Sequence, residues 1–190
     1  MIPNTYAKLS SQVLSNITTA NAVALSAVGV PATDDGAGAP TPREEIEPGG
    51  DHGDWETDVP EDGEVGVGDT ITFTKTIHDE DVRRFAASSG DTNPLHLDDE
   101  FAEETRFDGR IAHGILVSGL ISAALARIPG EVVYLSQDLE FLAPVEIGDR
   151  VTAECSVVED LGNGQYRLTT TVTGSEVVID GEAVVLLLES

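Results

Sequence analysis

A chain of 190 residues suits one domain with extensions and is short for two ordinary domains. Its 35 acidic and 10 basic residues give a formal charge of −25, which argues against nucleic acid or an anionic membrane as a partner. The single cysteine, Cys155, excludes a disulfide framework, and no apolar run is long enough to span a membrane. The N-terminus has no basic region followed by an apolar stretch, so we expect no secretory signal and a cytoplasmic protein.

The acidic residues are spread along the whole chain. Residues 31–64 carry twelve acids and one arginine, and residues 65–190 carry a further twenty-three acids. Such self-repulsion is relieved by salt, which shortens the Debye length to about 3 Å near 1 M. The composition therefore predicts a protein of a high-salt organism, such as a halophilic archaeon. An ordinary acidic protein is the alternative.

Residues 1–30 contain a predicted amphipathic helix. Apolar residues recur near the 3.6-residue period at Tyr6, Leu9, Val13, Ile17, Ala20 and Ala24. Lys8 is the one charge in residues 4–28. We expect this segment either to dock on an apolar surface or to pack on its own dimer or remain unfolded. Residues 31–64 hold six glycines and five prolines and are expected to form an acidic linker.

Residues 65–190 have the pattern of one globular domain. A strand is expected at Ile71–Ile77, then a short helix begun by Asp79 or Asp81, a loop with one helical turn over 88–112, and a long buried helix at 113–127. Four further strands are expected at Val132–Leu142, Arg150–Glu159, Gln165–Thr173 and Glu176–Leu188. Asn163-Gly164 predicts a hairpin turn between two of them. Consecutive strands and one buried helix indicate an α+β fold, an antiparallel sheet wrapped around a central helix.

The loop before the long helix holds the residues that suggest chemistry. Gly90 permits an unusual backbone angle and Asn93-Pro94 stiffens the turn, so Asp91 and His96 lie on a rigid non-helical segment. A carboxylate and an imidazole that share a water can act as a general acid and base near neutral pH. From these residues alone, ordinary turn residues beside a surface histidine are the favoured interpretation, and the acid–base pair is the alternative.

The same residues resemble the signature of MaoC-like dehydratases and (R)-specific enoyl-CoA hydratases. The resemblance covers residues 65–190 and lies in three blocks. The first block contains Phe85, Ser89-Gly90-Asp91, Asn93-Pro94, His96 and Phe101-Ala102. The second block runs from Ala112-His113-Gly114-Ile115-Leu116 to Ser122, and the third contains Phe141, Pro144-Val145 and Gly148-Asp149. It implies a hot-dog fold and a homodimer that binds acyl-CoA near its interface. The implied reaction is syn addition of water to a trans-2-enoyl-CoA, which gives the (R)-3-hydroxyacyl-CoA.

The resemblance also implies roles for individual residues. Asp91 and His96 would handle the water and its protons, and Asn93 would orient the loop or the His96 ring. The backbone N–H of Gly114 would stabilise the oxyanion. Ser122 would contact substrate or simply allow close packing, and His113 is expected to be structural. No metal or redox cofactor is expected, since a coenzyme A thioester is the substrate and the reaction transfers no electrons.

Several alternatives remain open at the level of sequence. A thioesterase on this fold often uses a helix carboxylate, and residues 113–126 contain none. A non-catalytic acyl-CoA-binding protein is also possible. A branched dicarboxylyl-CoA such as mesaconyl-CoA would need a cation for its second carboxylate, for which Arg106 and Arg110 are candidates. If the product supplies polyhydroxyalkanoate synthesis, residues 4–28 could bind the polymer granule, so that the cytoplasmic enzyme would be granule-associated.

Overall fold

The computed structural model describes residues 55–60 and 65–188. All of these belong to the second of two compact units, Gly50–Ser190. The predicted N-terminal helix and most of the predicted linker lie outside the described residues. In the part of the chain that the structure describes, no helix has both the length and the apolar character needed to cross a membrane.

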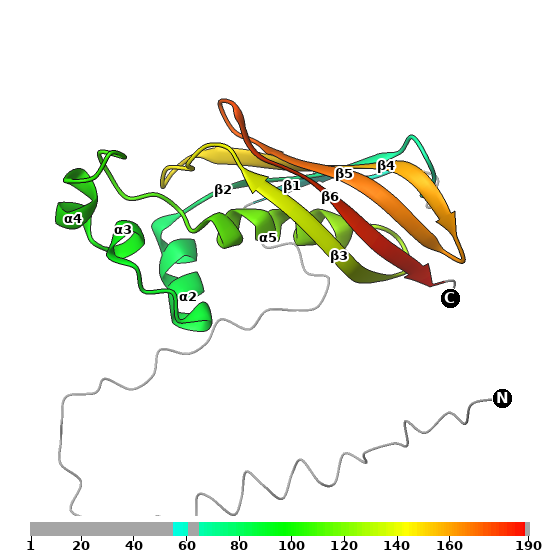
Figure 1. Cartoon of the computed structure of the whole chain (residues 1–190), viewed down its shortest axis with the longest axis horizontal. Helices are drawn as coiled ribbons and strands as arrows, with labels where there is room; N and C mark the ends of the chain where they lie inside the picture. The colour runs from blue at the N-terminus through cyan, green and yellow to red at the C-terminus, as the bar shows by residue number, and fades with distance from the viewer. Residues whose placement is uncertain (1–54, 61–64, 189–190) are drawn as a thin grey trace, which may run out of the picture. The chain divides into compact units, whose positions relative to one another are not determined.

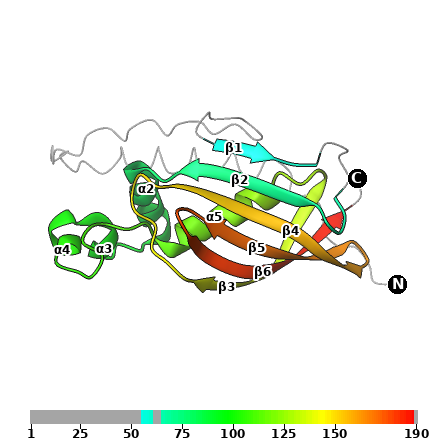
Figure 2. The same cartoon turned by 90° about the horizontal axis from the view of Figure 1, so that it is seen from above.

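Six antiparallel strands form one curved sheet, and a single helix runs along one face of it (Figures 1 and 2). The strands are β1 (Trp55–Asp58), β2 (Thr70–Thr76), β3 (Glu131–Phe141), β4 (Arg150–Gly162), β5 (Gln165–Thr173) and β6 (Val177–Leu188), and their spatial order is β1-β2-β4-β5-β6-β3. The predicted hairpin joins β4 to β5 through Asn163 and Gly164, whose φ angles of 55° and 75° are those such turns require. The predicted hot-dog arrangement is confirmed.

The helix on the sheet is α5 (Gly114–Leu125), and it packs mainly on β2, β4 and β5. Its residues Leu120, Ile121 and Leu125 are buried against strand residues such as Ile71 and Leu168. Burial is one-sided in the single chain, which differs from the prediction of a helix buried over most of its circumference. Ile115 is 59% exposed. The helix has one sheet to cover it, so the side that faces away from that sheet stays open.

The linker prediction is wrong for Trp55–Asp58, which form β1 at one edge of the sheet beside β2. The Trp55 ring lies 5.7 Å from that of Phe73, and the Arg127 guanidinium carbon lies 5.6 Å from the Trp55 ring centroid. The average composition of residues 31–64 is that of a solvated chain. The packing of Trp55 and the open edge of β2 beside it are enough to form the short strand β1.

Three short helices project at one end of the sheet: α2 (Asp79–Ser89), α3 (Pro94–Leu97) and α4 (Asp99–Glu103) (Figure 1). Asp81 starts α2 by accepting a hydrogen bond from the His78 N–H, and Gly90 ends it with a φ of 80°. Asp98 caps α4 through the Phe101 N–H. The region predicted as a loop with one turn therefore contains two helices, which side-chain caps hold in place.

Candidate active site

The segment that joins α2 to α3 carries Asp91 in a turn held by short-range hydrogen bonds. The Asp91 N–H donates to the Ser89 hydroxyl, and one Asp91 carboxylate oxygen accepts the Asn93 N–H at 3.3 Å. The Asn93 side chain accepts the Leu95 N–H at 3.1 Å and so caps α3, with Pro94 in its first turn. Asn93 was predicted to orient either the loop or the His96 ring. In the structure its side-chain amide oxygen bonds the loop backbone. Asp91 is exposed and keeps its other carboxylate oxygen available.

His96 lies one turn into α3 and is 8% exposed. Its Nδ1 lies 2.8 Å from the carbonyl oxygen of Ile111. A carbonyl oxygen only accepts, so Nδ1 carries the proton of the neutral ring, and Nε2 is left with a free lone pair. This contact fixes both the orientation of the ring and the nitrogen that is free to accept a proton.

His113 supports this arrangement from below. It is 2% exposed, and its Nε2 donates to the Asp91 carbonyl oxygen at 3.0 Å. Its ring lies 3.9 Å from the His96 ring and 4.9 Å from the Phe85 ring, measured between centroids. His113 bonds the Asp91 backbone, and its ring packs against the His96 ring with an angle of 34° between the ring planes. These contacts suit the structural role expected of His113, which stays a prediction.

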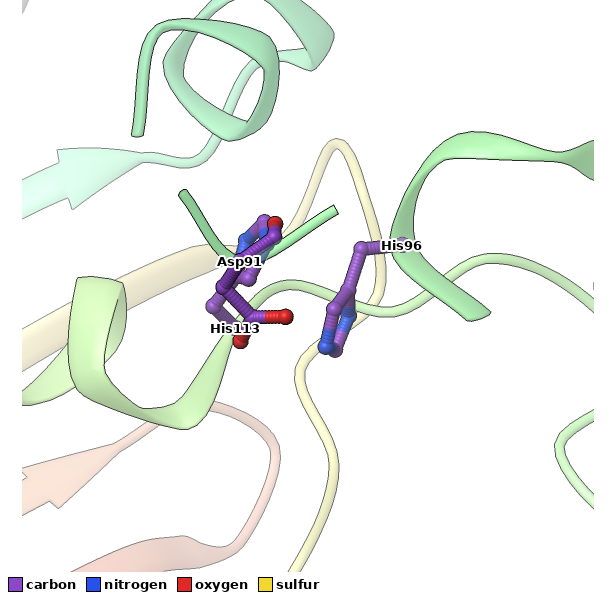
Figure 3. A group of neighbouring side chains, drawn as sticks. All are labelled: Asp91, His96 and His113. Carbon is purple, nitrogen blue, oxygen red and sulfur yellow. The ribbon is translucent and has the colours of Figure 1, made fainter. Parts of the chain in front are cut away.

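Asp91, His96 and His113 come together from the loop after α2, from α3 and from the residue that precedes α5 (Figure 3). One polar side-chain atom of each lies within 4.8 Å of the other two, and Figure 3 shows the Asp91 carboxylate directed toward the His96 ring. A water that bonds two groups at about 2.8 Å spans about 4 to 5 Å, so Asp91 and His96 can share one water. This spacing lets a carboxylate and an imidazole exchange a proton with the same water molecule.

The same three residues are the group with the donor chemistry to hold a metal among residues 55–60 and 65–188. Two of the four ring nitrogens are already bound to carbonyl oxygens, and the remaining nitrogen of His113 is buried without a partner in the described chain. The expectation that the reaction needs neither metal nor redox cofactor stays a prediction.

A cavity of about 270 Å³ opens beside His96. Its wall comes from the end of β3, the following turn, β6 and the start of α5, and most of it is apolar. The lining residues are His96, Arg106, Phe107, Ile111, Ala112, Gly114, Val117, Phe141, Leu142, Ala143, Pro144, Val145, Val178 and Ile179. Such a wall suits an apolar chain, and the His96 ring forms part of it.

Gly114 places a helix start at this cavity. It is the first residue of α5, whose first backbone N–H groups have no partner within the helix. A Cβ at this position would lie 2.8 Å from Cε1 of Phe141, so a larger residue would require the Phe141 ring to shift. The N–H and the positive end of the helix dipole can therefore face a ligand oxygen in the cavity.

Ser122 is not brought to this site in the single chain. It is exposed on α5, about 12 Å along the axis from Gly114, and does not line the cavity. Its substrate-binding role stays a prediction. Phe141 was noticed in the sequence only as part of a motif, and its packing on Gly114 was missed. The signal available was Pro144, which lies three residues after the end of β3 and lines the cavity.

Arg110 is a second residue whose place the sequence left open. Its side chain is 12% exposed and donates to Asp99 at 2.6 Å and to Asp79 at 2.7 Å, with a longer contact of 3.4 Å to the His96 carbonyl. Hydrogen bonds from Arg83 and Arg110 lower the pKa of Asp79. Burial alone would lower the pKa of Arg110, but the two aspartates outweigh burial and the pKa is raised. Arg110 thus ties α2, α3 and α4 together.

Comparison with known proteins places these residues in a family. The model of the MaoC like domain matches residues 64–181. The (R)-specific enoyl-CoA hydratase of Rhodospirillum rubrum is 44% identical over 65% of this chain and 89% of its own length. The 3-hydroxybutyryl-CoA dehydratase of Methylorubrum extorquens is 49% identical over 66% of this chain and 81% of its own.

A solved structure agrees with these relatives. The R-hydratase PhaJ1 of Pseudomonas aeruginosa, in its unliganded form, superposes with a TM-score of 0.65 at 39% identity, over 72% of this chain and 90% of that one. The predicted family and the predicted class of hydro-lyase enzymes are confirmed. The chain belongs to the family of MaoC-like domain proteins.

Proposed function

We propose that this protein is an (R)-specific enoyl-CoA hydratase, which adds water across a trans-2-enoyl-CoA to give the (R)-3-hydroxyacyl-CoA. The observation that carries the proposal is the meeting of three features. His96, with an oriented lone pair on Nε2, and Gly114, at the start of α5, line one cavity. The free carboxylate oxygen of Asp91 lies beside His96. The names of the relatives support the substrate class and the stereochemistry.

In this mechanism the water oxygen bonds to C3 of the enoyl group while the C2=C3 π electrons move toward the thioester. The carbonyl oxygen becomes an enolate oxygen, which accepts a hydrogen bond from the Gly114 N–H. One such donor is worth about 3–4 kcal/mol in the transition state. The enolate then collapses, and C2 takes a proton on the same face.

Asp91 and His96 handle the protons as a coupled pair. One proton leaves the water and one reaches C2, so the pair ends the cycle in its starting state. His113 keeps Asp91 in place through its backbone carbonyl, and the Ile111 carbonyl keeps Nε2 of His96 pointed at the water. The buried ring and the apolar wall exclude other water from the enolate.

The test is hydration of crotonyl-CoA in molar KCl, followed by loss of enoyl-thioester absorbance, with chiral analysis of the product. We expect the (R)-3-hydroxy product from wild type. Asp91→Asn should lower kcat by about 10³-fold, because a positioned acid–base group contributes about 10²–10⁴. Glu100→Gln removes the same charge from an exposed site in α4 and should leave kcat unchanged. No hydration by the folded wild type, or equal losses in the two variants, would contradict the proposal.

The enzyme acts as a homodimer in this proposal. β3 is an edge strand, so its outer backbone groups are unpaired within the described sheet, and Val133, Tyr134 and Leu135 on it are each about 40–50% exposed. An apolar edge of this kind is suited to pair with a second copy. Light scattering on a sizing column should give twice the mass of the chain, 40.0 kDa against 20.0 kDa. Leu135→Lys should shift the protein toward the monomer.

The proposal also includes a cytoplasmic setting at high salt and supply of monomer for polyhydroxyalkanoate synthesis, for which the product has the required (R) configuration. Residues 4–28 would then bind the granule. A deletion should end at residue 49, before the second compact unit, since β1 packs on the core. Co-sedimentation with granules that is unchanged by the deletion would rule out docking through this segment and leave the enzyme assignment intact.

A further inference from the structure

Two arginines four residues apart, Arg106 and Arg110, have opposite surroundings. Arg110 is nearly buried, and its donors are used by Asp79, Asp99 and the His96 carbonyl. It lines a neighbouring pocket and not the cavity that contains His96. Arg110 is therefore already neutralised by the protein and cannot also receive a substrate anion.

Arg106 is exposed, and it lines the cavity that also contains His96 and Gly114. A residue that is both exposed and part of the cavity wall lies at the opening. Its guanidinium carbon sits 4.7 Å from the centroid of the Phe107 ring, which lines the same cavity. Stacking on a ring steers the guanidinium without using its N–H groups.

The donors of Arg106 have no acceptor in the described part of the chain. Arg83, Arg84, Arg110, Arg150 and Arg167 each pair with an aspartate or glutamate. Arg127 stacks over Trp55 and Phe73 at the other side of the core. Of the arginines in residues 65–188, Arg106 is thus the one that has no acidic partner and faces a cavity.

The wall around Arg106 contains no acid. Thirty-five of the 190 residues are acidic, yet the fourteen lining residues include no Asp or Glu. A chain of charge −25 repels an anion in its surroundings, so a lone guanidinium at an acid-free opening is where an anion can be held. Its planar N–H groups match two oxygens of one phosphate or carboxylate.

We propose that Arg106 binds an anionic group of the thioester substrate at the opening of the cavity. The inference rests on the proposed function, because it takes the thioester as the ligand that His96 also meets. The bound oxyanion has two possible sources in such a molecule, a phosphate of the coenzyme or a second carboxylate on the acyl group. Both offer the paired oxygens that the guanidinium requires.

The experiment compares wild type with Arg106→Gln and Arg106→Lys on three substrates: crotonyl-CoA, crotonyl-pantetheine, which carries no anion, and mesaconyl-CoA, which carries a second carboxylate. Arg106→Gln should raise KM about tenfold for a thioester whose anion is bound, which corresponds to about 1.4 kcal/mol, with kcat within twofold. Arg106→Lys should recover part of this loss. Arg167→Gln removes a paired arginine from β5, outside the cavity wall, and should change neither constant.

The pattern across substrates identifies the anion. A higher KM for both CoA thioesters and not for crotonyl-pantetheine identifies the phosphate, whereas a higher KM for mesaconyl-CoA alone identifies the carboxylate. The same factor on all three substrates, or no change on any, would overturn the inference. Calorimetric titration with crotonyl-CoA and mesaconyl-CoA gives the same comparison without turnover. It separates a failure of Arg106 binding from a failure of the proposed reaction.

Discussion

The segment of the proposed active site, residues 90–114, and the core between α5 and the sheet are held by different forces. In the proposed active site, directional contacts set the geometry: His113 to the Asp91 carbonyl, His96 to the Ile111 carbonyl, and Arg110 to two aspartates. In the core, residues such as Ile121 and Leu168 are at most 1% exposed and make apolar contacts. Directional bonds position chemistry, and burial supplies stability. A single substitution should therefore change either activity or stability without changing the other.

The largest loss of activity with little loss of stability is expected at His96. His96→Gln keeps a polar side chain of similar size but removes the Nε2 lone pair that accepts a proton. We expect kcat for crotonyl-CoA to fall about 10³-fold. The free energy of unfolding should change by only about 1 kcal/mol, because the ring makes few core contacts. Denaturation followed by circular dichroism, beside the kinetic assay, tests both statements, and a kcat within tenfold of wild type would exclude His96 from proton transfer.

In the core we expect the opposite result, a large loss of stability with little change in activity. Leu168→Ala removes a fully buried side chain from β5 and should lower the free energy of unfolding by about 2–5 kcal/mol. The folded fraction should keep its kcat, since Leu168 does not line the cavity. Val158→Ala, on an exposed residue of β4, is the matched control, with an expected change of about 0.5 kcal/mol or less. Equal losses in the two variants would show that burial does not decide stability here.

A smaller effect is expected where the two regions meet, at Gly114. Gly114→Ala puts a Cβ 2.8 Å from the Phe141 ring, so the ring and the start of α5 must move apart. A displacement near 1 Å at the oxyanion donor should lower kcat/KM by about 10²-fold. Combining it with Phe141→Leu, which makes room, should restore most of the activity. A double-mutant cycle in kcat/KM measures this coupling, and strictly additive losses would contradict it.

The smallest effect is expected at Arg110. Arg110→Met should lower kcat about tenfold, because α3 and the His96 carbonyl lose a tether. The folded pKa of Asp79 is depressed by Arg83 and Arg110, so its stabilising contribution is present above its ordinary pKa of 3.8 and is lost as pH falls through the folded value. The difference in unfolding free energy between wild type and Arg110→Met should thus shrink below about pH 4.

Arg167→Met is the control for that comparison. Arg167 also pairs with two glutamates, but it is 40% exposed and lies on β5 away from the site. The Arg167→Met substitution should leave kcat unchanged at every pH. A stability difference for Arg110→Met that stays constant from pH 7 to pH 3 would show that Asp79 is not the group that senses its loss.

Prediction from sequence worked best where the signal was local. Local sequence patterns placed β2, the β4–β5 hairpin at Asn163-Gly164 and the long helix α5 within a few residues. The pairing of Asp91 with His96 could also be predicted, because only four residues separate them in the chain. The prediction that both lie on a non-helical segment is wrong for His96, which belongs to α3. Trp55 was missed because its strand exists only through β2, which is supplied by a different part of the chain.

The sequence by itself determined the fold class, the family and the candidate acid–base pair, since periodicity, turn residues and a motif are properties of neighbouring residues. Tertiary structure alone decided which nitrogen of His96 is free, which ring a side chain at residue 114 would meet and which of two arginines lines the cavity. Each of these depends on a partner distant in the chain: Ile111 for His96, Phe141 for Gly114, and Asp79 for Arg110. Contacts of that kind are set by how the chain packs.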